Sequence, residues 1–341
     1  YVIIFVLLAI SFPLVMVFRE KLPADWSGIL QNIGGTWMII LLYGALLFLL
    51  FDILRGINHL VAFFPEMVTG NYILVKRILL GAGVVAITAV LITGHWKYLH
   101  PRTENLEITT SKSLGGDGEL KILFFSDLHL GSLISEQQLR NYADMINKQD
   151  YDLLLIGGDL MDGDHEVWEK RHFAEILATI QPRYGKYGIM GNHEYYNGAD
   201  ASIRFYEKAG IRLLRDSVAS PESNVILVGR DDRTNSGRLP VEKLTEGLDK
   251  VDNYIIVLDH QPAELGQVRS AGADLLLCGH THNGQIFPLT VFIHAMWEVA
   301  YGHKKIGDMD VYVSSGLGLW GPQFRIGSNS EIVKITVREQ K

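Results

Sequence analysis

Residues 120–129 read Leu-Lys-Ile-Leu-Phe-Phe-Ser-Asp-Leu-His, a mostly apolar run that ends in an aspartate and a histidine with one residue between them. A short, nearly continuous apolar run of this kind predicts a strand that is buried on both faces of a sheet. Asp127 and His129 follow directly at its end. In extended backbone, residues two apart point to the same side, so we expect both side chains to face one site.

Four further polar motifs follow apolar runs of the same kind, and each supplies side chains that bind divalent metals. Imidazole, carboxylate and amide ligands without a thiolate suit manganese, iron, zinc or nickel. Glycines precede three of the polar residues, and we expect them to let the backbone turn where a Cβ would interfere. A lone Asp-x-His is usually a polar strand end, but five motifs in this order favour a metal centre. The other four are Gly157-Gly158-Asp159, Gly191-Asn192-His193-Glu194, Asp259-His260-Gln261-Pro262 and Gly279-His280-Thr281-His282.

A centre of this composition attracts phosphate. Two divalent ions with the ionised carboxylates of Asp127 and Asp159 keep a formal charge of about +2, because neutral imidazoles and an amide add none. Two ions roughly 3.5–4 Å apart can hold a shared hydroxide in line with phosphorus and neutralise its nonbridging oxygens. The motifs therefore predict hydrolysis of a phosphate ester or anhydride.

The pattern around the motifs predicts an α/β domain with more than one sheet, because strands first alternate with helices and then follow one another. Residues 106–109 alternate like a strand and residues 115–118 supply a turn, so we expect a hairpin with residues 120–126 to open the domain. Further strands are expected at residues 152–156, 225–228, 254–258, 274–277, 311–313 and 332–337. Helices are expected at residues 135–148, with Ser135 as N-cap, 167–180 and 201–209.

The first hundred residues have a different composition, with only ten of the 69 charged side chains of the chain. Residues 1–18 and 26–51 contain no charge, and residues 78–96 contain only His95. Each run is long enough to cross a hydrocarbon core of roughly 30 Å as a helix, whereas buried core helices seldom stay uncharged for so long. We therefore expect a transmembrane helical region over residues 1–98, with spans at about 1–18, 30–51 and 78–96.

Details of the membrane arrangement stay open. Residues 60–65 are apolar but too short to span, so they could extend the second helix, lie in the interface or re-enter the bilayer. The chain begins at Tyr1 without a methionine, so we expect an N-terminal piece to be missing. Basic residues near the three spans divide too evenly for the positive-inside rule to decide: Arg55, Lys76 and Arg77 against Arg19, Lys21, Lys97 and Arg102.

Charge and cysteine content exclude several classes of protein. Residues 101–341 carry a net charge of −9, which argues against a nucleic-acid-binding surface because phosphate backbones are held mainly by Lys and Arg. Cys278 is the only cysteine, which excludes disulfide scaffolds and four-cysteine zinc modules. It ends an apolar run, so we expect a small core residue and not a nucleophile.

With these motifs in place, the sequence resembles the calcineurin-like metallophosphoesterases, whose pattern is Asp-x-His, Gly-Asp, Gly-Asn-His-Glu/Asp, His and Gly-His-x-His. The resemblance covers about residues 120–337 and extends to Ser314-Ser315-Gly316-Leu317-Gly318 and Arg325-Ile326-Gly327. It is greatest to the membrane-associated branch that includes bacterial envelope phosphoesterases and a UDP-2,3-diacylglucosamine pyrophosphatase. The resemblance implies a four-layer α/β/β/α sandwich over residues 104–341, with a dimetal site at the sheet edge.

The resemblance also implies roles for individual residues. His193 would not bind metal but would face the substrate, where it protonates the leaving oxygen or stabilises the transition state. Glu194 would orient His193. Asn283 stands where this branch often has glycine, which leaves the ligands intact but makes the shape of the substrate entrance an open question. Two ligand groups would share one bridging carboxylate: Asp127, His129 and His282 for one ion, Asn192, His260 and His280 for the other, and Asp159 between them.

Three other groups of residues are of secondary interest. Residues 289–297 are more apolar than a loop should be, and form either a core helix or an apolar lip beside the metals in which an acyl chain could lie. One hypothesis for the loop around Asp231-Asp232 is phosphate contact by Arg230, Arg233 and Arg238. Four histidines outside the motifs are expected to be ordinary surface or core residues: His165, His172, His294 and His303.

Together these features predict a membrane-embedded dimetal phosphohydrolase that cleaves a phosphoester or pyrophosphate bond, with a lipid-linked substrate because several spans exceed what tethering needs. The alternatives are a membrane-tethered phosphodiesterase of soluble nucleotide-type substrates and a catalytically silent binding module. We expect two divalent ions (Mn, Fe, Zn or Ni), contact with the bilayer and no nucleic acid partner; the sequence does not predict the oligomeric state. We expect a bacterial cell membrane and an extracytoplasmic catalytic domain, although similarity to the diacylglucosamine enzymes would require the cytoplasmic face.

Overall fold

The computed structural model describes residues 2–18 and 22–340, and the chain falls into two compact units. One comprises Tyr1–Trp96 with Gly321–Ile326, and the other Lys97–Trp320 with Gly327–Lys341. Residues 321–326, which we assigned to the catalytic domain, therefore belong to the helical unit. Tyr1 and Lys341, the outer bounds of the predicted domains, and Arg19 and Lys21, counted for orientation, lie outside the described residues.

Within its described residues, the helical unit contains two helices that are long and apolar enough to cross a membrane. These are α2 (Ala24–Val61) and α4 (Tyr72–Leu99), which include the predicted spans at 30–51 and 78–96. Only 6% of the most apolar window of each is buried, so neither has the surroundings of a core helix. Helix α1 (Val2–Phe18) is apolar but about 26 Å long at 1.5 Å per residue, so a span at residues 1–18 stays a prediction.

The segment between α2 and α4 settles one open alternative for residues 60–65. Leu60 and Val61 extend α2, and the helix ends at Ala62, whose backbone is left-handed (φ 50°). A short helix, α3 (Glu66–Gly70), then leads to α4. The first of the three alternatives is therefore confirmed for these two residues.

The late segment Gly321–Ile326 packs within the helical unit, against the C-terminal part of α4. The backbone N–H of Arg325 donates a hydrogen bond to the carbonyl of Gly94 (2.9 Å). The ring Nδ1 of His95 lies 2.9 Å from the carbonyl oxygen of Gln323. A piece of the chain more than two hundred residues after α4 is thus part of the helical unit.

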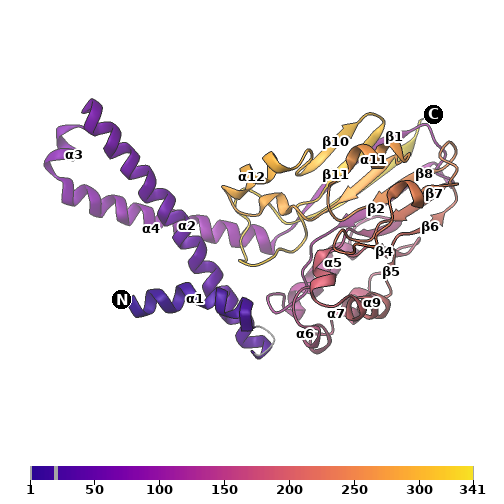
Figure 1. Ribbon diagram of the computed structural model, residues 1–341, viewed down its shortest axis with the longest axis horizontal. Helices are drawn as coiled ribbons and strands as arrows, with labels where there is room; N and C mark the ends of the chain where they lie inside the picture. The colour runs from indigo at the N-terminus through magenta and orange to yellow at the C-terminus, as the bar shows by residue number, and fades with distance from the viewer. Residues whose placement is uncertain (1, 19–21, 341) are drawn as a thin grey trace. The chain divides into compact units, whose positions relative to one another are not determined.

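The second unit is built on two six-stranded sheets (Figure 1). The first sheet has the order β1 (Arg102–Thr110), β12 (Glu331–Glu339), β2 (Glu119–Phe125), β3 (Leu153–Ile156), β4 (Lys186–Gly188) and β5 (Arg212–Leu213). The second sheet has the order β10 (Gly302–Ile306), β11 (Met309–Val313), β9 (Leu275–Cys278), β8 (Tyr254–Leu258), β7 (Val225–Gly229) and β6 (Ser217–Glu222).

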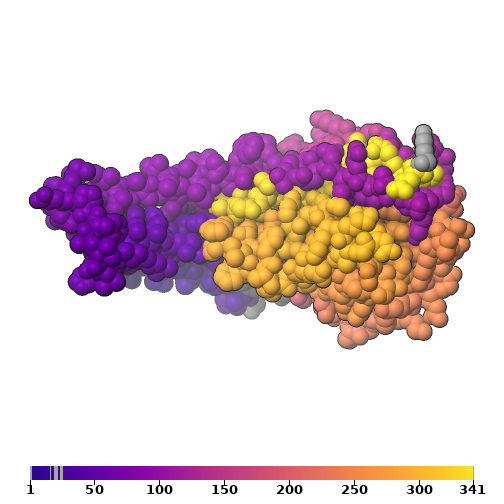
Figure 2. Space-filling view, turned by 90° about the horizontal axis from the view of Figure 1, so that it is seen from above, coloured from indigo at the N-terminus to yellow at the C-terminus, as the bar shows by residue number. Residues whose placement is uncertain are grey.

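The predicted hairpin of the first two strands is wrong. The closing strand β12 lies between β1 and β2: Ile335 pairs with Leu106 in parallel and with Ile122 in antiparallel register. Figure 2 shows β1, in purple, beside β12, in yellow. β12 is buried along nearly its whole length, whereas β1 alternates exposed and covered residues. The two-sided apolar strand therefore takes the inner position, and the amphipathic one forms the edge.

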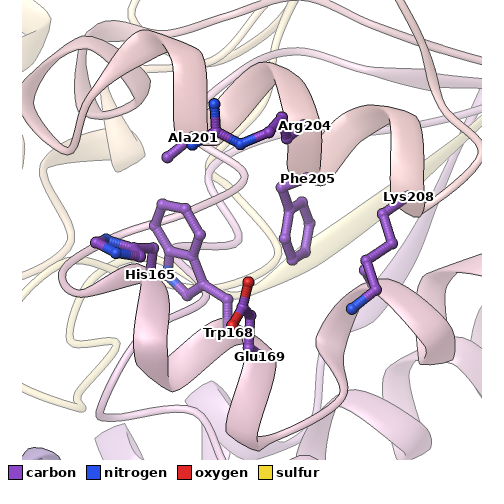
Figure 3. Close-up of a pocket in the computed structure, with 8 residues that line it drawn as sticks. His165, Trp168, Glu169, Ala201, Arg204, Phe205 and Lys208 are labelled. Carbon is purple, nitrogen blue, oxygen red and sulfur yellow. The ribbon is translucent and has the colours of Figure 1, made fainter.

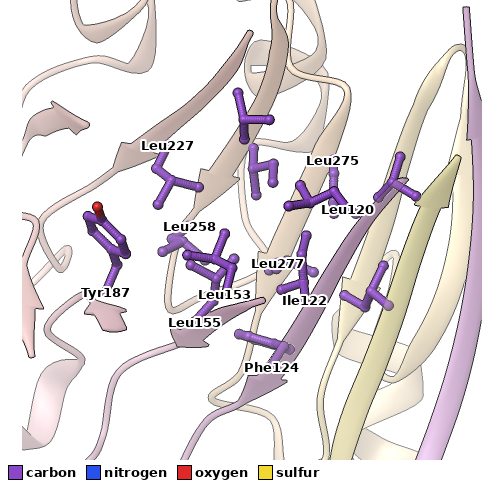
Figure 4. Close-up of a cluster of buried hydrophobic side chains, with 14 of the residues drawn as sticks. Leu120, Ile122, Phe124, Leu153, Leu155, Tyr187, Leu227, Leu258, Leu275 and Leu277 are labelled. Carbon is purple, nitrogen blue, oxygen red and sulfur yellow. The ribbon is translucent and has the colours of Figure 1, made fainter. Parts of the chain in front are cut away.

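Apolar side chains fill the space between the two sheets (Figure 4), among them Phe124 and Leu155 of the first sheet and Leu258 and Leu277 of the second. Two helices, α10 (Val241–Leu244) and α11 (Leu265–Ser270), cover the other face of the second sheet. The fold is an α/β sandwich with two sheets, as the sequence predicts.

The remaining helices mostly match the predicted ranges. Helix α5 (Glu136–Asn147) begins after Ser135, whose hydroxyl accepts a hydrogen bond from the N–H of Gln138 (3.1 Å), which confirms the predicted cap. The single helix expected at residues 167–180 is two helices, because the left-handed backbone of His172 (φ 51°) interrupts it. The others are α6 (His165–Lys170), α7 (Phe173–Ala178), α8 (Asn192–Tyr196), α9 (Ala199–Lys208), η2 (His282–Gly284) and α12 (Leu289–Met296).

Candidate metal centre

The polar motifs meet because four of them follow the carboxyl ends of paired strands. In the first sheet β2 and β3 run parallel, and they lead into Asp127 and Asp159. In the second sheet β8 and β9 run parallel and lead into His260 and His280. The fifth motif follows β4 and opens α8. Side chains after neighbouring parallel strands gather at one edge of a sheet, where α/β folds commonly bind ligands.

Six of the seven predicted ligand residues form two compact clusters, in each of which the candidate ligand atoms lie within 4.8 Å of one another. The seventh, Asn192, joins the second cluster, since its Oδ1 lies 3.0 Å from Nδ1 of His280. His129, Asp159 and His193 form a third possible grouping. The two main clusters are Asp127, His129 and His282, and Asp159, His260 and His280.

The donor atoms fit divalent cations. His260 Nδ1 lies 2.8 Å from the carbonyl oxygen of Gly157, so this nitrogen carries a proton and Nε2 is the atom left to face a cation. Burial alone would lower the pKa of His260, but the neighbouring carboxylates, Asp159 above all, raise it well above its usual value, so a bound cation would take the place of a proton on Nε2. Nε2 is buried and has no hydrogen-bond partner, although it lies 3.2 Å from Asp159 Oδ2. A cation beside both atoms would satisfy them, and the Gly157 contact would fix the ring as ligating histidines require.

Burial also sets protonation states that suit metal binding. It lowers the pKa of His129 and of His280 to about 4, so both imidazoles are neutral near pH 7 and can ligate. Burial raises the pKa of Asp127 to about 6, although the charge of His260 acts to lower it. A bound cation would favour the ionised carboxylate and offset that cost.

The backbone of the candidate ligands is strained. Asp127, His129, Asp159, His280 and His282 all have left-handed φ values between 49° and 70°. Each such residue costs of order 1 kcal/mol, and such strain concentrates at functional sites. The paired side chains therefore converge from a left-handed backbone. The extended backbone that we inferred from their spacing is wrong.

Two glycines make the crowded geometry possible, for different reasons. Gly158 has φ +87°, and a Cβ there would lie 2.8 Å from Nδ1 of His260. Gly279 has an ordinary φ, but a Cβ at that position would collide with the carboxylate of Asp127. Only Gly158 supplies the sharp turn that we expected; Gly279 provides space.

The structure assigns a partner to His193 that sequence reasoning missed. Nδ1 of His193 lies 3.1 Å from Oδ1 of Asp162, and the backbone N–H of His193 donates to Oδ1 of Asp159 (2.9 Å). Burial alone would lower the pKa of His193, but the hydrogen bond with Asp162 and the neighbouring carboxylates raise it. The only signal for Asp162 in the sequence is its position three residues after Asp159.

The hydrogen bonds of the Glu194 carboxylate go to backbone groups, and its role in orienting His193 stays a prediction. Its fully buried carboxylate accepts hydrogen bonds from four backbone N–H groups at 2.7–3.1 Å, those of Asp159, Leu160, Met161 and Gly191. Burial, followed by the charge of Asp159, raises the pKa of Glu194 to about 7, and the backbone donors oppose this shift. Glu194 therefore holds two loops together behind the metal ligands.

The family model for the calcineurin-like phosphoesterases matches residues 120–284. Over 244 residues the chain is 32% identical to an uncharacterized metallophosphoesterase of Aquifex aeolicus (strain VF5), which covers 70% of this chain and 92% of that protein. This chain belongs to the calcineurin-like metallophosphoesterase family. It is a metal-dependent phosphoesterase whose His and Asp clusters are consistent with a dinuclear metal site.

Two further relatives are longer than the matched region. A transmembrane protein with metallophosphoesterase domain from Danio rerio is 33% identical over 255 residues, which cover 70% of this chain and 58% of that protein. An uncharacterized metallophosphoesterase of Helicobacter pylori (strain J99 / ATCC 700824) is 33% identical over 221 residues, which cover 63% of this chain and 59% of that protein. This metallophosphoesterase thus spans less than two thirds of either protein.

Aromatic rings surround the candidate metal centre of this metallophosphoesterase. Tyr196 and Trp320 lie beside His193, with ring centroids 5.5 and 6.2 Å from the imidazole. Both are substantially exposed, at 62% and 43%. Trp297 stands edge-on to His280, 6.0 Å away. Two exposed aromatic side chains therefore lie beside His193.

Two of the three arginines in the phosphate-contact hypothesis have carboxylate partners in the structure. Arg230 and Arg238 both pair with Asp259, at 2.7 and 2.9 Å, and with Glu264. Arg230 and Asp259 are almost fully buried. Because Asp259 directly precedes His260, this ion-pair cluster supports a candidate ligand from behind. Arg233 is exposed, and for it the hypothesis stays a prediction.

The histidines outside the motifs include one that touches the site. His294 of α12 places Nε2 2.8 Å from Oδ1 of Asn283, the residue that follows the last motif histidine. His303 pairs with Asp310 at 2.7 Å on the edge of the second sheet. Cys278 is buried, as expected, and burial raises the pKa of its thiol well above the usual value.

A separate pocket of about 250 Å³ lies among α6, α7 and α9 (Figure 3). Its lining includes Trp168, Phe205 and Arg204 and none of the seven predicted ligands. The indole N–H of Trp168 donates to the backbone carbonyl of Asp162 (3.0 Å). The pocket wall thus supports the loop that carries the partner of His193.

Proposed function

We propose that this metallophosphoesterase hydrolyses a phosphoester or pyrophosphate bond of a lipid-linked substrate at the surface of a membrane. The observation that carries the proposal is the position of Asp159 between the two clusters. Its Oδ2 lies 3.8 Å from Nε2 of His129 and 3.2 Å from Nε2 of His260. One carboxylate that reaches both clusters is what a pair of adjacent metal ions requires.

In this proposal His193 is the catalytic residue that faces the substrate. Its Nδ1 is held by Asp162, so Nε2 can protonate the leaving oxygen while the carboxylate stabilises the imidazolium. When bound, two divalent ions would neutralise the nonbridging oxygens and supply an activated water. The residues that would hold them are Asp127, His129 and His282 for one ion, Asn192, His260 and His280 for the other, and Asp159 for both.

Three observations support a lipid-linked substrate in a bilayer. The chain carries two helices that could cross a membrane. Relatives from Danio rerio and Bos taurus are named transmembrane proteins with a metallophosphoesterase domain. Helix α12 exposes apolar side chains, and Trp297 directly after it touches the candidate ligand His280. An acyl chain beside α12 would place its attached phosphate near the metals.

The test is hydrolysis by the purified full chain, loaded with Mn²⁺, Fe²⁺, Zn²⁺ or Ni²⁺ in turn. Phosphorylated and pyrophosphorylated lipids in phosphatidylcholine vesicles are compared with bis(p-nitrophenyl) phosphate in solution. We expect turnover of both classes, with kcat/KM higher for a lipid. Mass spectrometry of lipids that copurify with metal-stripped protein identifies the substrate. A protein that binds metal stoichiometrically and hydrolyses no phosphoester would be a silent binding module.

A second candidate, a phosphodiesterase of soluble nucleotides, is favoured by one observation. The exposed rings of Tyr196 and Trp320 flank His193 and could stack on a base, a contact worth about 1–3 kcal/mol. If this candidate is right, Tyr196→Ala raises KM for nucleotide diesters about tenfold or more. If the lipid proposal is right, nucleotides are poor substrates and the variant changes little.

We also propose a bacterial cell membrane and the extracytoplasmic face for the catalytic unit, on the resemblance to envelope phosphoesterases. The test is protease access to a C-terminal tag in spheroplasts. Protection of the tag until the membrane is permeabilised would place the unit in the cytoplasm instead.

A further inference from the structure

Helix α12 is an apolar helix with none of its residues buried. Val291, Phe292 and Met296 are 58%, 61% and 71% exposed, and residues 286–297 include no charged side chain. The core-helix alternative for this segment is therefore wrong. A surface this apolar on a soluble domain marks an interaction site more often than a free surface.

The helix is held firmly from its other side. His294 lies 2.8 Å from Asn283 through Nε2 and Oδ1, and Trp297 packs against His280. These contacts tie both the middle and the end of α12 to the last metal motif. Its exposed face is therefore a fixed surface beside the candidate metal centre.

The chain itself shows which end of the catalytic unit carries α12. The chain leaves this unit after Trp320 and returns at Gly327, and both residues adjoin the start of α12. The carbonyl of Trp320 accepts a hydrogen bond from Gln285 Nε2 (3.1 Å), and a Cβ at Gly327 would lie 3.3 Å from Phe287 and from Thr290.

The first connection between the units is hydrogen-bonded to the chain that follows Gly327. Helix α4 ends at Leu99 and β1 begins at Arg102, so the two intervening residues can separate them by only about 10 Å. The N–H of Arg102 donates to the carbonyl of Ser330, which follows Gly327 by three residues. Residues on both sides of the second connection thus contact residues 285–290, and the first connection is hydrogen-bonded to the stretch that follows it.

We propose that the exposed face of α12 lies in the interface of the bilayer, with Val291, Phe292 and Met296 among the lipids. The partner is the lipid surface itself, and the absence of charge on this segment predicts no preference for anionic lipids. The inference rests on the membrane location in the proposed function, but not on the identity of the substrate. An immersed α12 would hold the metal centre at the height of a lipid headgroup.

The test introduces single cysteines for labelling. The one natural cysteine, Cys278, is buried and therefore protected from the label. Phe292→Cys and Met296→Cys are labelled with a nitroxide in the full chain in phosphatidylcholine vesicles. Val251→Cys is the matched control, since Val251 is an apolar residue of the same unit that is 80% exposed. We expect a ratio of collisions with oxygen to collisions with a water-soluble nickel chelate about threefold or more above the control. Label uptake by the unaltered chain measures any contribution of Cys278.

Three results would overturn the proposal. One is a ratio equal to that at Val251. Another is dipolar broadening between labels without lipid contact, which would show that a second copy covers the face. The third is immersion that appears only when a phosphorylated lipid is added, which would make α12 an acyl-chain site and not a bilayer contact.

A second measurement separates this inference from the proposed function. The variant Phe292→Asp with Met296→Asp should lower turnover of a vesicle-bound phosphoester about tenfold or more and leave bis(p-nitrophenyl) phosphate hydrolysis unchanged; Val251→Asp should change neither. Equal loss on both substrates contradicts the interfacial role. Immersed labels in a protein that hydrolyses no lipid would refute only the proposed substrate.

Discussion

Replacing Asp162 with Asn tests whether this carboxylate acts through His193. Oδ1 of Asp162 accepts from the backbone N–H of Gly163 (2.8 Å) and lies 3.1 Å from Nδ1 of His193. An Asn side chain can keep both contacts through its own Oδ1, so the substitution removes the charge and preserves the shape. Asp162 belongs to neither main ligand cluster, and we expect metal content to stay the same.

The size of the effect follows from the change in hydrogen-bond type. A bond to a charged partner is worth about 1.5–3 kcal/mol and a neutral one about 0.5–1.5 kcal/mol. The difference of about 1–2 kcal/mol corresponds to a loss in rate of about 5- to 30-fold. The contact with Asp162 raises the pKa of His193, so the variant should lower it. Because a general acid must be protonated, the alkaline limb of the kcat/KM profile should move to lower pH.

The assay compares two leaving groups. An alkoxide needs a proton as it leaves, whereas p-nitrophenolate does not, so the loss should be large for an alkyl phosphodiester and small for bis(p-nitrophenyl) phosphate. The same substitution is also made in a His193→Ala background. In that background Asp162→Asn should lower the rate almost no further, since the imidazole through which Asp162 acts is absent.

Either of two results would refute the reasoning. If Asp162→Asn lowers kcat/KM as much in the His193→Ala background as in the unaltered protein, the carboxylate does not act through His193. If the loss is the same for both leaving groups, His193 does not protonate the leaving oxygen.

Three other predictions concern the metal ligands and their supports. Asp159→Ala should abolish metal binding and activity, whereas His193→Ala should keep the metals and lose rate; metal analysis of the purified variants distinguishes them, and an active Asp159 variant contradicts the dimetal assignment. Gly158→Ala should lower both metal affinity and Tm, because it adds a contact with His260 to the cost of a left-handed backbone, of about 1 kcal/mol. Gly163→Ala, with φ +72° and open space around it, should show the backbone cost alone, and equal losses would argue against crowding at His260. Arg230→Met should lower stability by about 1–3 kcal/mol, measured by thermal unfolding, and leave KM unchanged, whereas a raised KM would restore the phosphate-contact hypothesis.

The residues that the structure gathers into clusters could be chosen from the sequence, because ligand chemistry and position after a strand are local properties. Asp127, Asp159, His260 and His280 each follow an apolar run, and parallel pairing of those runs brings them together. Asp162 escaped notice because its contact with His193 joins two loops whose residues are 31 positions apart in the sequence. The backbone contacts of Glu194 were not predicted, because adjacency in sequence does not show which way a buried carboxylate points.

The errors in the fold have a different origin. Placing β12 between β1 and β2 requires pairing across more than two hundred residues, which no local pattern records. The apolar composition of residues 289–297 was clear, but a buried helix and an exposed one have the same composition. Only the structure shows that α12 presents its apolar side chains outward.

The position of residues 321–326 bears on how this protein can be divided. In many membrane-anchored enzymes the helices can be removed and the catalytic domain still folds. Here Pro322 packs against Gly35 of α2, Arg325 is fully buried, and its N–H bonds to Gly94 of α4. A chain begun at Lys97 would leave this stretch without its partners, directly after Trp320, whose ring lies beside that of His193. Truncation at Lys97 should therefore expose Arg325 and the apolar residues around it, and we expect a chain that keeps α2 and α4 to be the more stable and soluble form.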